Sequence, residues 1–583
     1  MSSNSQDQCQ GGAESGDPHG EVRAQPPGPD APSADVDVPA VRRPPEGRRA
    51  SLARWGPATL LTIAAALLSL YKLGSSPMWN DETASVSISV QHGHELWSAI
   101  TSDGGSMSAY YMLLHTLFLA GLGQSAISVR LVSVAAFVVM VPFLYCLVLR
   151  CWGARVAVIA TALVITNRTV ISKAQEARGY TLGLLLVVVA TWLLTSVLRL
   201  SRPRLVAWAV VSALACYSLL LSPLLALAQV VSLGTLRRRA AEMRSAVIAA
   251  GLLAVLLVPL ALMAIHRGTG QIDWIAPIGA GSVTTFLYGL IVPGFPTWLR
   301  PLMLLAVVVG IVRVGREAVE NKAGSLERWH RVLLLSWAGL PLVAVLAISF
   351  AVSLLQPGYL IACVPAFAVL GAVGITTVAR SLAEGAARRI AAIRAGESSR
   401  AKRGAPVAGL VLGAGAAALF ALYPLAATWG HYGAVIENGP GETAYIVGLA
   451  RAGDGIIFDQ PSQRMIFNYY LLADFDKAGR FPLLPAPVWP SAPWGTQLAY
   501  AANHRVPAPG AIAAIEGRLT RIWVVDGGWA PLPRYLAQSR ALLASLGQHY
   551  PVVGEDDFKG VKVLLFSGSG SLPPGMHLWT GGG

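Results

Sequence analysis

The sequence predicts a polytopic α-helical membrane protein that carries a small α/β domain at its C-terminal end. The 583 residues are 54% hydrophobic and only 13% charged, and their mean hydropathy is +0.54. This composition is typical of membrane proteins. Apolar runs of about 20 residues, the length that crosses the hydrocarbon of a bilayer, follow one another as far as residue 430. Beyond that point the sequence becomes polar enough to fold in water.

Residues 1–50 are expected to form a disordered cytoplasmic tail. They are rich in Pro, Gly, Ser and Asp and contain too few large apolar residues to bury a core. A cleavable signal peptide is not expected, because no short apolar core follows a basic start. A cluster of arginines directly before the first span predicts that the tail stays in the cytoplasm. These arginines are Arg42, Arg43, Arg48, Arg49 and Arg54.

The region 51–430 is expected to be a transmembrane domain of about eleven spans. The apolar runs are 55–73, 127–149, 156–170, 181–198, two within 205–236, 246–265, 299–314, 332–353, 359–378 and 407–429. With the N-terminus inside, every arginine-rich turn falls on the cytoplasmic side, as the positive-inside rule requires. The loop after the first span, the segment 172–180, the loop 266–298 and the C-terminal region then lie outside. The sequence therefore predicts a multi-pass protein of the plasma membrane.

Residues 431–583 are expected to form an extracytoplasmic α/β domain. Strand-like apolar runs occupy 455–458, 521–525 and 561–566, and helical patterns lie at 442–451 and 533–546. Alternation of strands and helices is typical of such a domain. The Pro-rich stretch 481–494 is expected to be an ordered irregular loop.

Several function classes lack the residues that they need. The net charge of +14 could indicate nucleic-acid binding, but the arginines gather in turns between apolar runs. The five cysteines form no CxxC pair, which argues against a disulfide framework or a zinc site. The chain has no phosphate-binding loop, dinucleotide fingerprint or HExxH motif. Asp474–Asp476 resembles the metal-binding DxD motif of nucleotide-sugar enzymes, but one such short match is more typical of exposed acids in a helix or turn. Energy for any chemistry outside the cell must therefore arrive in the substrate, as it does in a polyprenyl-phosphate-linked sugar.

The adjacent acids Asp81 and Glu82 directly follow the first span and are the first candidate site. A carboxylate at the membrane surface can position and deprotonate a hydroxyl acceptor. Roughly half of such pairs would simply be solvated loop or helix-cap residues. Tyr110, Tyr111 and His115, in the same loop, are expected to be interfacial membrane anchors more often than ligands.

The segment 172–180 supplies a second set of candidates. Lys173 and Arg178 suit an anionic headgroup, because charges at membrane depth usually face a cavity or a partner and Arg can grip phosphate oxygens through two hydrogen bonds. A structural ion pair of Arg178 with Glu176 or Asp81 is the alternative. In the loop 266–298, His266, Arg267, Asp273 and Trp274 are further candidates. Asp273 and Trp274 could bind a sugar, although an interfacial aromatic belt explains Trp274 and Trp298 equally well.

The order of these features resembles the GT-C superfamily of membrane glycosyltransferases. More narrowly, it resembles the bacterial branch related to protein O-mannosyltransferases and to the lipid A aminoarabinose transferase. The matching segments are Trp79–Glu82, Tyr110–His115, Ser128–Ser133, Gln175–Leu182 and, more weakly, Asp273–Ile275 and Gln356–Leu360. Two positions depart from the pattern: Gly358 stands where relatives often have Arg, and the region 216–222 lacks a His that many of them carry.

The resemblance implies an inverting transfer of a sugar, with mannose favoured, from a polyprenyl phosphate to a cell-envelope lipoglycan, polysaccharide or protein. Asp81 would be the base or acceptor-positioning group, with Glu82 assisting, and Lys173 and Arg178 would bind the donor phosphate. The remaining substrate contacts would come from Gln175, Glu176, Tyr180, Asp273, Trp274 and Tyr359. No cofactor is certain, and a divalent metal ion that bridges acid and phosphate stays open. The alternatives are a transporter or flippase of lipid-linked glycans and a non-catalytic envelope scaffold.

Overall fold

The computed structural model describes residues 48–195, 201–236, 240–268, 272, 275, 277–393, 411, 414–416, 418–420, 422–426, 428–430, 432–475, 483–494, 518–527 and 533–579. Nearly all of the expected N-terminal tail therefore lies outside the described residues, as does Asp476 of the DxD match.

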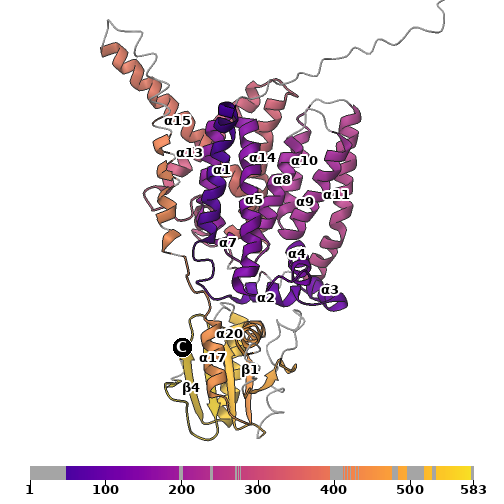
Figure 1. The fold of residues 1–583 in the computed structure, drawn as a ribbon, viewed down its shortest axis with the longest axis vertical. Coiled ribbons are helices and arrows are strands. Elements are labelled where there is room, and N and C mark those ends of the chain that lie inside the picture. Colours follow the sequence, from indigo (N-terminus) through magenta and orange to yellow (C-terminus); the bar gives the residue numbers. More distant parts are fainter. Residues whose placement is uncertain are drawn as a thin grey trace, which may run out of the picture. The chain divides into compact units, whose positions relative to one another are not determined.

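Helices occupy the apolar runs that the sequence marks (Figure 1). They are α1 (Arg48–Leu70), α5 (Ala126–Trp152), α6 (Ala154–Ile165), α8 (Tyr180–Thr195), α9 (Arg202–Ser218), α10 (Ser222–Leu233), α11 (Ala240–Arg267), α13 (Arg300–Glu320), α14 (Leu326–Ile348) and α15 (Val364–Ile393). Among the described residues, four stretches are long and apolar enough to cross a membrane, namely 126–152, 240–267, 326–348 and 357–386. A fifth is reached if α6 and α7 (Arg168–Ala174), which meet at 60°, form one broken span. The several membrane-length helices are confirmed, whereas eleven spans and the orientation of the termini stay predictions.

Helices α13 and α15 pack with their backbones almost in contact. A Cβ atom built at Gly310 would lie 1.9 Å from the carbonyl oxygen of Leu370, and one at Gly374 would lie 1.8 Å from that of Ala306. Small residues permit this close approach. Within lipid no hydrophobic effect drives helices together, so van der Waals packing of this kind holds them in contact. The two helices are therefore closely packed within the bundle.

The expected loop between the first two spans contains three short helices, α2 (Asn80–Ser89), α3 (Gly93–Ser102) and α4 (Ser108–Leu119), which lie at one end of the bundle together with α7 (Figure 1). Glu82 and every later residue of α2 are buried. Tyr110 and Tyr111 of α4 are also buried, at 0% and 1% exposure, and hydrogen-bond inside the protein. They pack in the core and do not face lipid as anchors. The short helices η1 (Pro357–Cys363) and α12 (Ser282–Ile291) lie in contact with each other.

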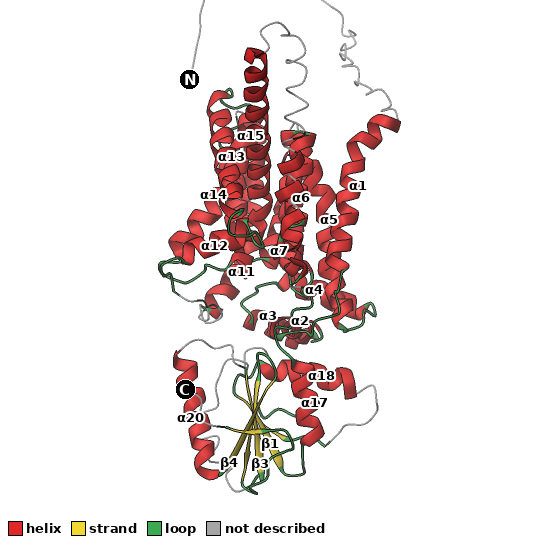
Figure 2. Cartoon of the chain, turned by 90° about the vertical axis from the view of Figure 1, so that its left-hand side faces the viewer, coloured by secondary structure: helices red, strands yellow, loops and turns green. Residues whose placement is uncertain are grey.

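The C-terminal region forms a mixed sheet in the order β2-β1-β3-β5-β4-β6. Strands β1 (Asp454–Phe458), β2 (Ala486–Trp489) and β3 (Arg521–Asp526) are parallel, and β4 (Val552–Asp557), β5 (Lys562–Ser567) and β6 (His577–Leu578) add antiparallel neighbours. Helices α17 (Gly439–Leu449) and α18 (Gln463–Phe475) cover one face and α20 (Pro533–His549) covers the other (Figure 2). Alternate strand residues enter the two cores because successive side chains point to opposite faces.

The predicted strands and helices of this region are present, so the small α/β domain is confirmed. The prediction of an irregular loop at 481–494 is wrong in part, because strand β2 lies within it. The short elements α18, β4 and β6 were not expected.

Candidate active site

The acids Asp81 and Glu82 occupy the first turn of α2, where the N-terminal end of the helix dipole favours negative charge. Consecutive residues of a helix point about 100° apart, so the two carboxylates face different surroundings. Glu82 is buried, whereas the side chain of Asp81 is 38% exposed. Of the two, Asp81 is the one that a substrate can reach.

Glu82 lies in a closed hydrogen-bond network with Arg130 of α5. The Arg130 Nε donates to Glu82 Oε1 at 2.8 Å, and Nη2 donates to Oε2 at 2.6 Å. Arg130 also donates to the carbonyl oxygens of Leu73, Ser76 and Pro77, and the backbone N–H of Ala177 donates to Glu82 Oε1 at 2.8 Å. The network joins the end of the first helix, the start of α2 and the segment 172–180.

Arg178 pairs with Asp81. Its Nη2 lies 3.3 Å from Asp81 Oδ2, and its Nη1 donates to the backbone oxygen of Asp81 at 3.3 Å. The Arg178 Nε is buried and has no hydrogen-bond partner among the residues that the structure describes. The ion pair of Arg178 with Asp81 is one of the two structural alternatives that the sequence offered. It also places the unpartnered Nε donor of Arg178 in the same guanidinium that contacts the exposed carboxylate of Asp81.

Lys173, on the last turn of α7, pairs with Glu176, with its Nζ 2.7 Å from Oε2 and 4.6 Å from the centroid of the Tyr180 ring. The departure at position 358 lies beside this lysine: a Cβ atom built at Gly358 would be 3.4 Å from Lys173 Cε and 3.8 Å from Tyr180 Cε1. Tyr359 follows in η1. Lys173 therefore stands next to the position where relatives often carry Arg.

The other expected contact residues are placed differently. Gln175 donates its side-chain amide to the carbonyl oxygens of Ser69 and Tyr71, so it anchors the end of α1. Asp273 and Trp274 lie outside the described residues. In the region 216–222, the backbone oxygen of Ser218 would lie 3.0 Å from a Cβ atom at Gly179, which leaves no room there for a larger residue at 179.

Besides Arg130, the sequence reasoning missed a second charged residue of the site. Asp103 ends α3, is 6% exposed and accepts a hydrogen bond of 2.9 Å from the hydroxyl of Tyr111. Burial raises the pKa of Asp103 to about 7, although Arg178, Tyr111 and Arg267 each oppose this rise. Arg267, which the sequence did single out, ends α11 with its Nε and Nη2 buried and unpartnered within the described part of the chain. A lone acid before two glycines carries no sequence signal that would distinguish Asp103 from a turn residue.

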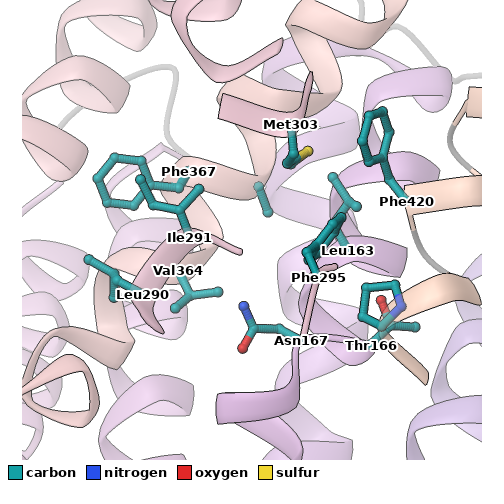
Figure 3. Close-up of a pocket in the computed structure, with 12 residues that line it drawn as sticks. Leu163, Thr166, Asn167, Leu290, Ile291, Phe295, Met303, Val364, Phe367 and Phe420 are labelled. Carbon is teal, nitrogen blue, oxygen red and sulfur yellow. The ribbon is translucent and has the colours of Figure 1, made fainter. Parts of the chain in front are cut away.

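An apolar pocket opens at the break between α6 and α7 (Figure 3). Its polar lining consists of Thr166 and Asn167, and Asn167 caps the N-terminus of α7. The remaining lining residues are Leu163, Leu290, Ile291, Phe295, Met303, Val364, Phe367, Ala368, Phe420 and Pro424. Both α7 and η1 connect this pocket to the cationic site, since α7 leads from Asn167 to Lys173 and η1 leads from Gly358 to Val364.

No three His, Cys, Asp or Glu side chains of the described residues gather closely enough to hold a metal ion. A divalent ion in the site therefore stays an untested possibility, in which Asp81 would be the accessible carboxylate.

The fold of this chain is similar to that of solved structures with which it shares little sequence identity. The particular likeness is to ArnT from Cupriavidus metallidurans in the apo state, with a TM-score of 0.51 and 15% identity over 89% of this chain and 100% of that one. Lower scores are found for the same protein bound to undecaprenyl phosphate (0.48, 14% identity, 89% of this chain and 99% of that one). The archaeal oligosaccharyltransferase AglB from Archaeoglobus fulgidus, in complex with an inhibitory peptide and a dolichol-phosphate, scores 0.47 (12% identity, 90% and 76%). No protein-family model and no curated protein matches the chain. The resemblance drawn from the sequence is thus confirmed at the level of the fold.

Proposed function

We propose that this protein is a membrane glycosyltransferase that moves a sugar, with mannose favoured, from a polyprenyl phosphate to an acceptor of the cell envelope. The observation that carries the proposal is the pairing of the exposed carboxylate of Asp81 with the guanidinium of Arg178. A base for a hydroxyl and a cation for a phosphate are the two groups that this transfer requires. The GT-C fold supports the same reaction class.

In the proposed reaction, the donor phosphate competes with Asp81 for Arg178. The released Asp81 carboxylate accepts the proton of the acceptor hydroxyl while the oxygen bonds to the anomeric carbon from the face opposite the leaving group. The bond between the anomeric carbon and the phosphate oxygen breaks, and the electron pair leaves with the polyprenyl phosphate. Arg178 stabilises that charge, and the configuration at the anomeric carbon is inverted.

Glu82 assists from a distance in this scheme. Because it is buried against Arg130 and bonded to the backbone N–H of Ala177, it fixes the start of α2 relative to Arg178. Lys173, already balanced by Glu176, supplies a second cation near the phosphate once the donor draws its ammonium group away from that carboxylate.

The lipid chain of the donor would occupy the pocket of Figure 3. Helix α7 has seven residues and is therefore about 10 Å long. Its capping residue Asn167, which lines the pocket, and Lys173 lie at opposite ends of this helix. A phosphate at Lys173 and Arg178 thus leaves the first isoprenoid units level with the apolar lining. Its mostly apolar lining with two polar residues matches the general character of small-molecule sites.

The test is sugar transfer in membranes from cells that lack the native gene, complemented with the wild type, Asp81→Asn, Arg178→Ala or the control Asp557→Asn, whose side chain is exposed on β4. Radiolabelled polyprenyl-phosphate mannose is the first donor. We expect label transfer by the wild type and the control, and loss of transfer in the two site variants at equal expression. A wild type that consumes no lipid-linked sugar of any kind would overturn the proposal in favour of a transporter or a scaffold.

A further inference from the structure

The turn that follows α3 places the Asp103 carboxylate within electrostatic range of Arg178. Gly104 and Gly105 adopt φ angles of 70° and 71°, which β-carbon-bearing residues rarely adopt. Together with Met107 at φ 58°, they reverse the chain so that α4 starts shortly after Asp103. A Cβ atom at Gly179 would lie 3.3 Å from Met107 Cγ, so this turn packs on the residue next to Arg178.

Four charged or titratable groups act on the Asp103 carboxylate, each from a different segment of the chain, and Tyr111 contacts it directly. They are Arg178 from the segment after α7, Tyr111 from α4, Asp81 from α2 and Arg267 from the end of α11. With Asp103 ionised, the two guanidinium groups balance the two carboxylates. With Asp103 protonated, the same cluster carries one net positive charge. An anionic donor is attracted to the second state more than to the first.

We propose that Asp103 is a positioning residue whose charge state controls how tightly Arg178 binds the anionic phosphate of the lipid donor. This inference rests on the proposed function. Tyr111 holds the carboxyl group in place through its hydroxyl, and Asp103 retains the guanidinium when Asp81 leaves it for the acceptor. The neutral form of Asp103 releases both arginines for the phosphate, so protonation strengthens donor binding.

The midpoint of this control falls in the physiological range, because burial raises the pKa of Asp103 to about 7. Donor binding therefore weakens as the pH rises from 6 to 8. If the bound phosphate raises the pKa of Asp103 by one further unit, the dissociation constant grows about fivefold over this range and about eightfold between pH 5.5 and 8.5. Loss of the Tyr111 hydroxyl removes a hydrogen bond that favours the ionised carboxylate, so the midpoint then moves to a higher pH.

The experiment measures binding of a polyprenyl methyl phosphate diester to the purified full-length protein in nanodiscs between pH 5.5 and 8.5. A diester is chosen because its single charge does not titrate in this range. For the wild type and the exposed control Asp557→Asn, we expect the dissociation constant to rise about eightfold over this range. For Asp103→Asn, which still offers an oxygen to Tyr111, we expect the tight value at every pH, and for Tyr111→Phe a rise displaced to higher pH.

Two results overturn the inference alone: binding by the wild type that does not change with pH, or an unchanged pH dependence in both Asp103→Asn and Tyr111→Phe. If Asp103→Asn fails to fold, the direction of the shift in Tyr111→Phe decides. A wild type that binds no diester at any pH overturns the proposed function and this inference with it.

Discussion

Replacement of Arg130 should destabilise the protein more than replacement of its partner Glu82. Arg130→Met leaves the Glu82 carboxylate without its cation inside the protein, and breaking a buried ion pair in this way costs about 3–5 kcal/mol. It also removes the donor from the carbonyl oxygens of Leu73, Ser76 and Pro77, which adds about 1 kcal/mol for each hydrogen bond. Glu82→Gln keeps an acceptor for Arg130 and for Ala177, so its expected cost is about 1.5–3 kcal/mol.

The double variant Glu82→Leu with Arg130→Met separates the ion pair from the carbonyl contacts. Replacement of a buried ion pair by apolar residues is often neutral. Here the three carbonyl oxygens still lack a donor, so we expect the double variant to remain less stable than the wild type, although more stable than Arg130→Met. The assay is the heating midpoint of the full-length protein in detergent, read by size-exclusion chromatography, with Asp557→Asn as the control. Hydrogen exchange at residues 73–79 locates the loss.

A midpoint for Arg130→Met equal to that of Asp557→Asn would refute the reasoning, as would full recovery in the double variant. The same series tests the role of Glu82. If Glu82→Gln retains the wild-type midpoint but loses sugar transfer, Glu82 takes a direct part in the chemistry and is not a positioning residue.

Three further predictions concern packing, the C-terminal sheet and pH. Gly310→Ala and Gly374→Ala should each lower the heating midpoint and the yield, because the new methyl group meets a backbone carbonyl, whereas Gly315→Ala on the same helix α13 meets nothing within 4 Å and should match the wild type. Asp454→Asn should speed hydrogen exchange in β1 and β3 of the full-length protein, because Asp454 pairs with Arg521 at 2.6 Å and accepts from Trp523 Nε1 at 2.9 Å in a buried cluster; unchanged exchange would contradict this. The raised pKa of Asp103 means that the native state binds a proton more tightly than the unfolded state, so its contribution to stability falls as the pH rises from about 4 to about 7. Asp103→Asn should therefore raise the heating midpoint more at pH 8 than at pH 5, and equal changes at both values would speak against it.

Apolar length and strand composition were sufficient to predict most of the elements. Helices such as α5 and α14 follow from runs that must satisfy their backbone internally in lipid. Strands β3 and β5 follow from continuous β-branched and aromatic residues. The sequence reasoning missed α18, although its apolar residues follow a helical period, and it did not indicate β2, because Pro487 weakens a strand pattern. Apolar length alone does not predict the number of spans, because short helices such as α10 are apolar but fall below membrane length.

The candidate site was predictable where charge stands out against apolar surroundings. A charge at the start of an apolar span indicates a partner, and this signal could have assigned Arg130 to one of the acids after the first span. The Asp81–Arg178 contact was foreseen as an alternative. The contact of Tyr111 with Asp103 was not, because it depends on a turn with left-handed backbone at Gly104, Gly105 and Met107 and not on any residue pattern.

The two adjacent acids show why the helix that carries them decides their roles. Both are carboxylates on the first turn of α2, and composition alone cannot rank them. A rotation of about 100° between neighbouring residues turns Glu82 toward Arg130 in the core and leaves Asp81 facing Arg178 with part of its surface exposed. A buried carboxylate that accepts three hydrogen bonds cannot approach a substrate hydroxyl without breaking them, whereas Asp81 holds its partner at 3.3 Å, a long contact. The group that binds most weakly to the protein is therefore the one that is free to exchange its partner for a substrate, and the group that binds most strongly is the one that keeps the first in place.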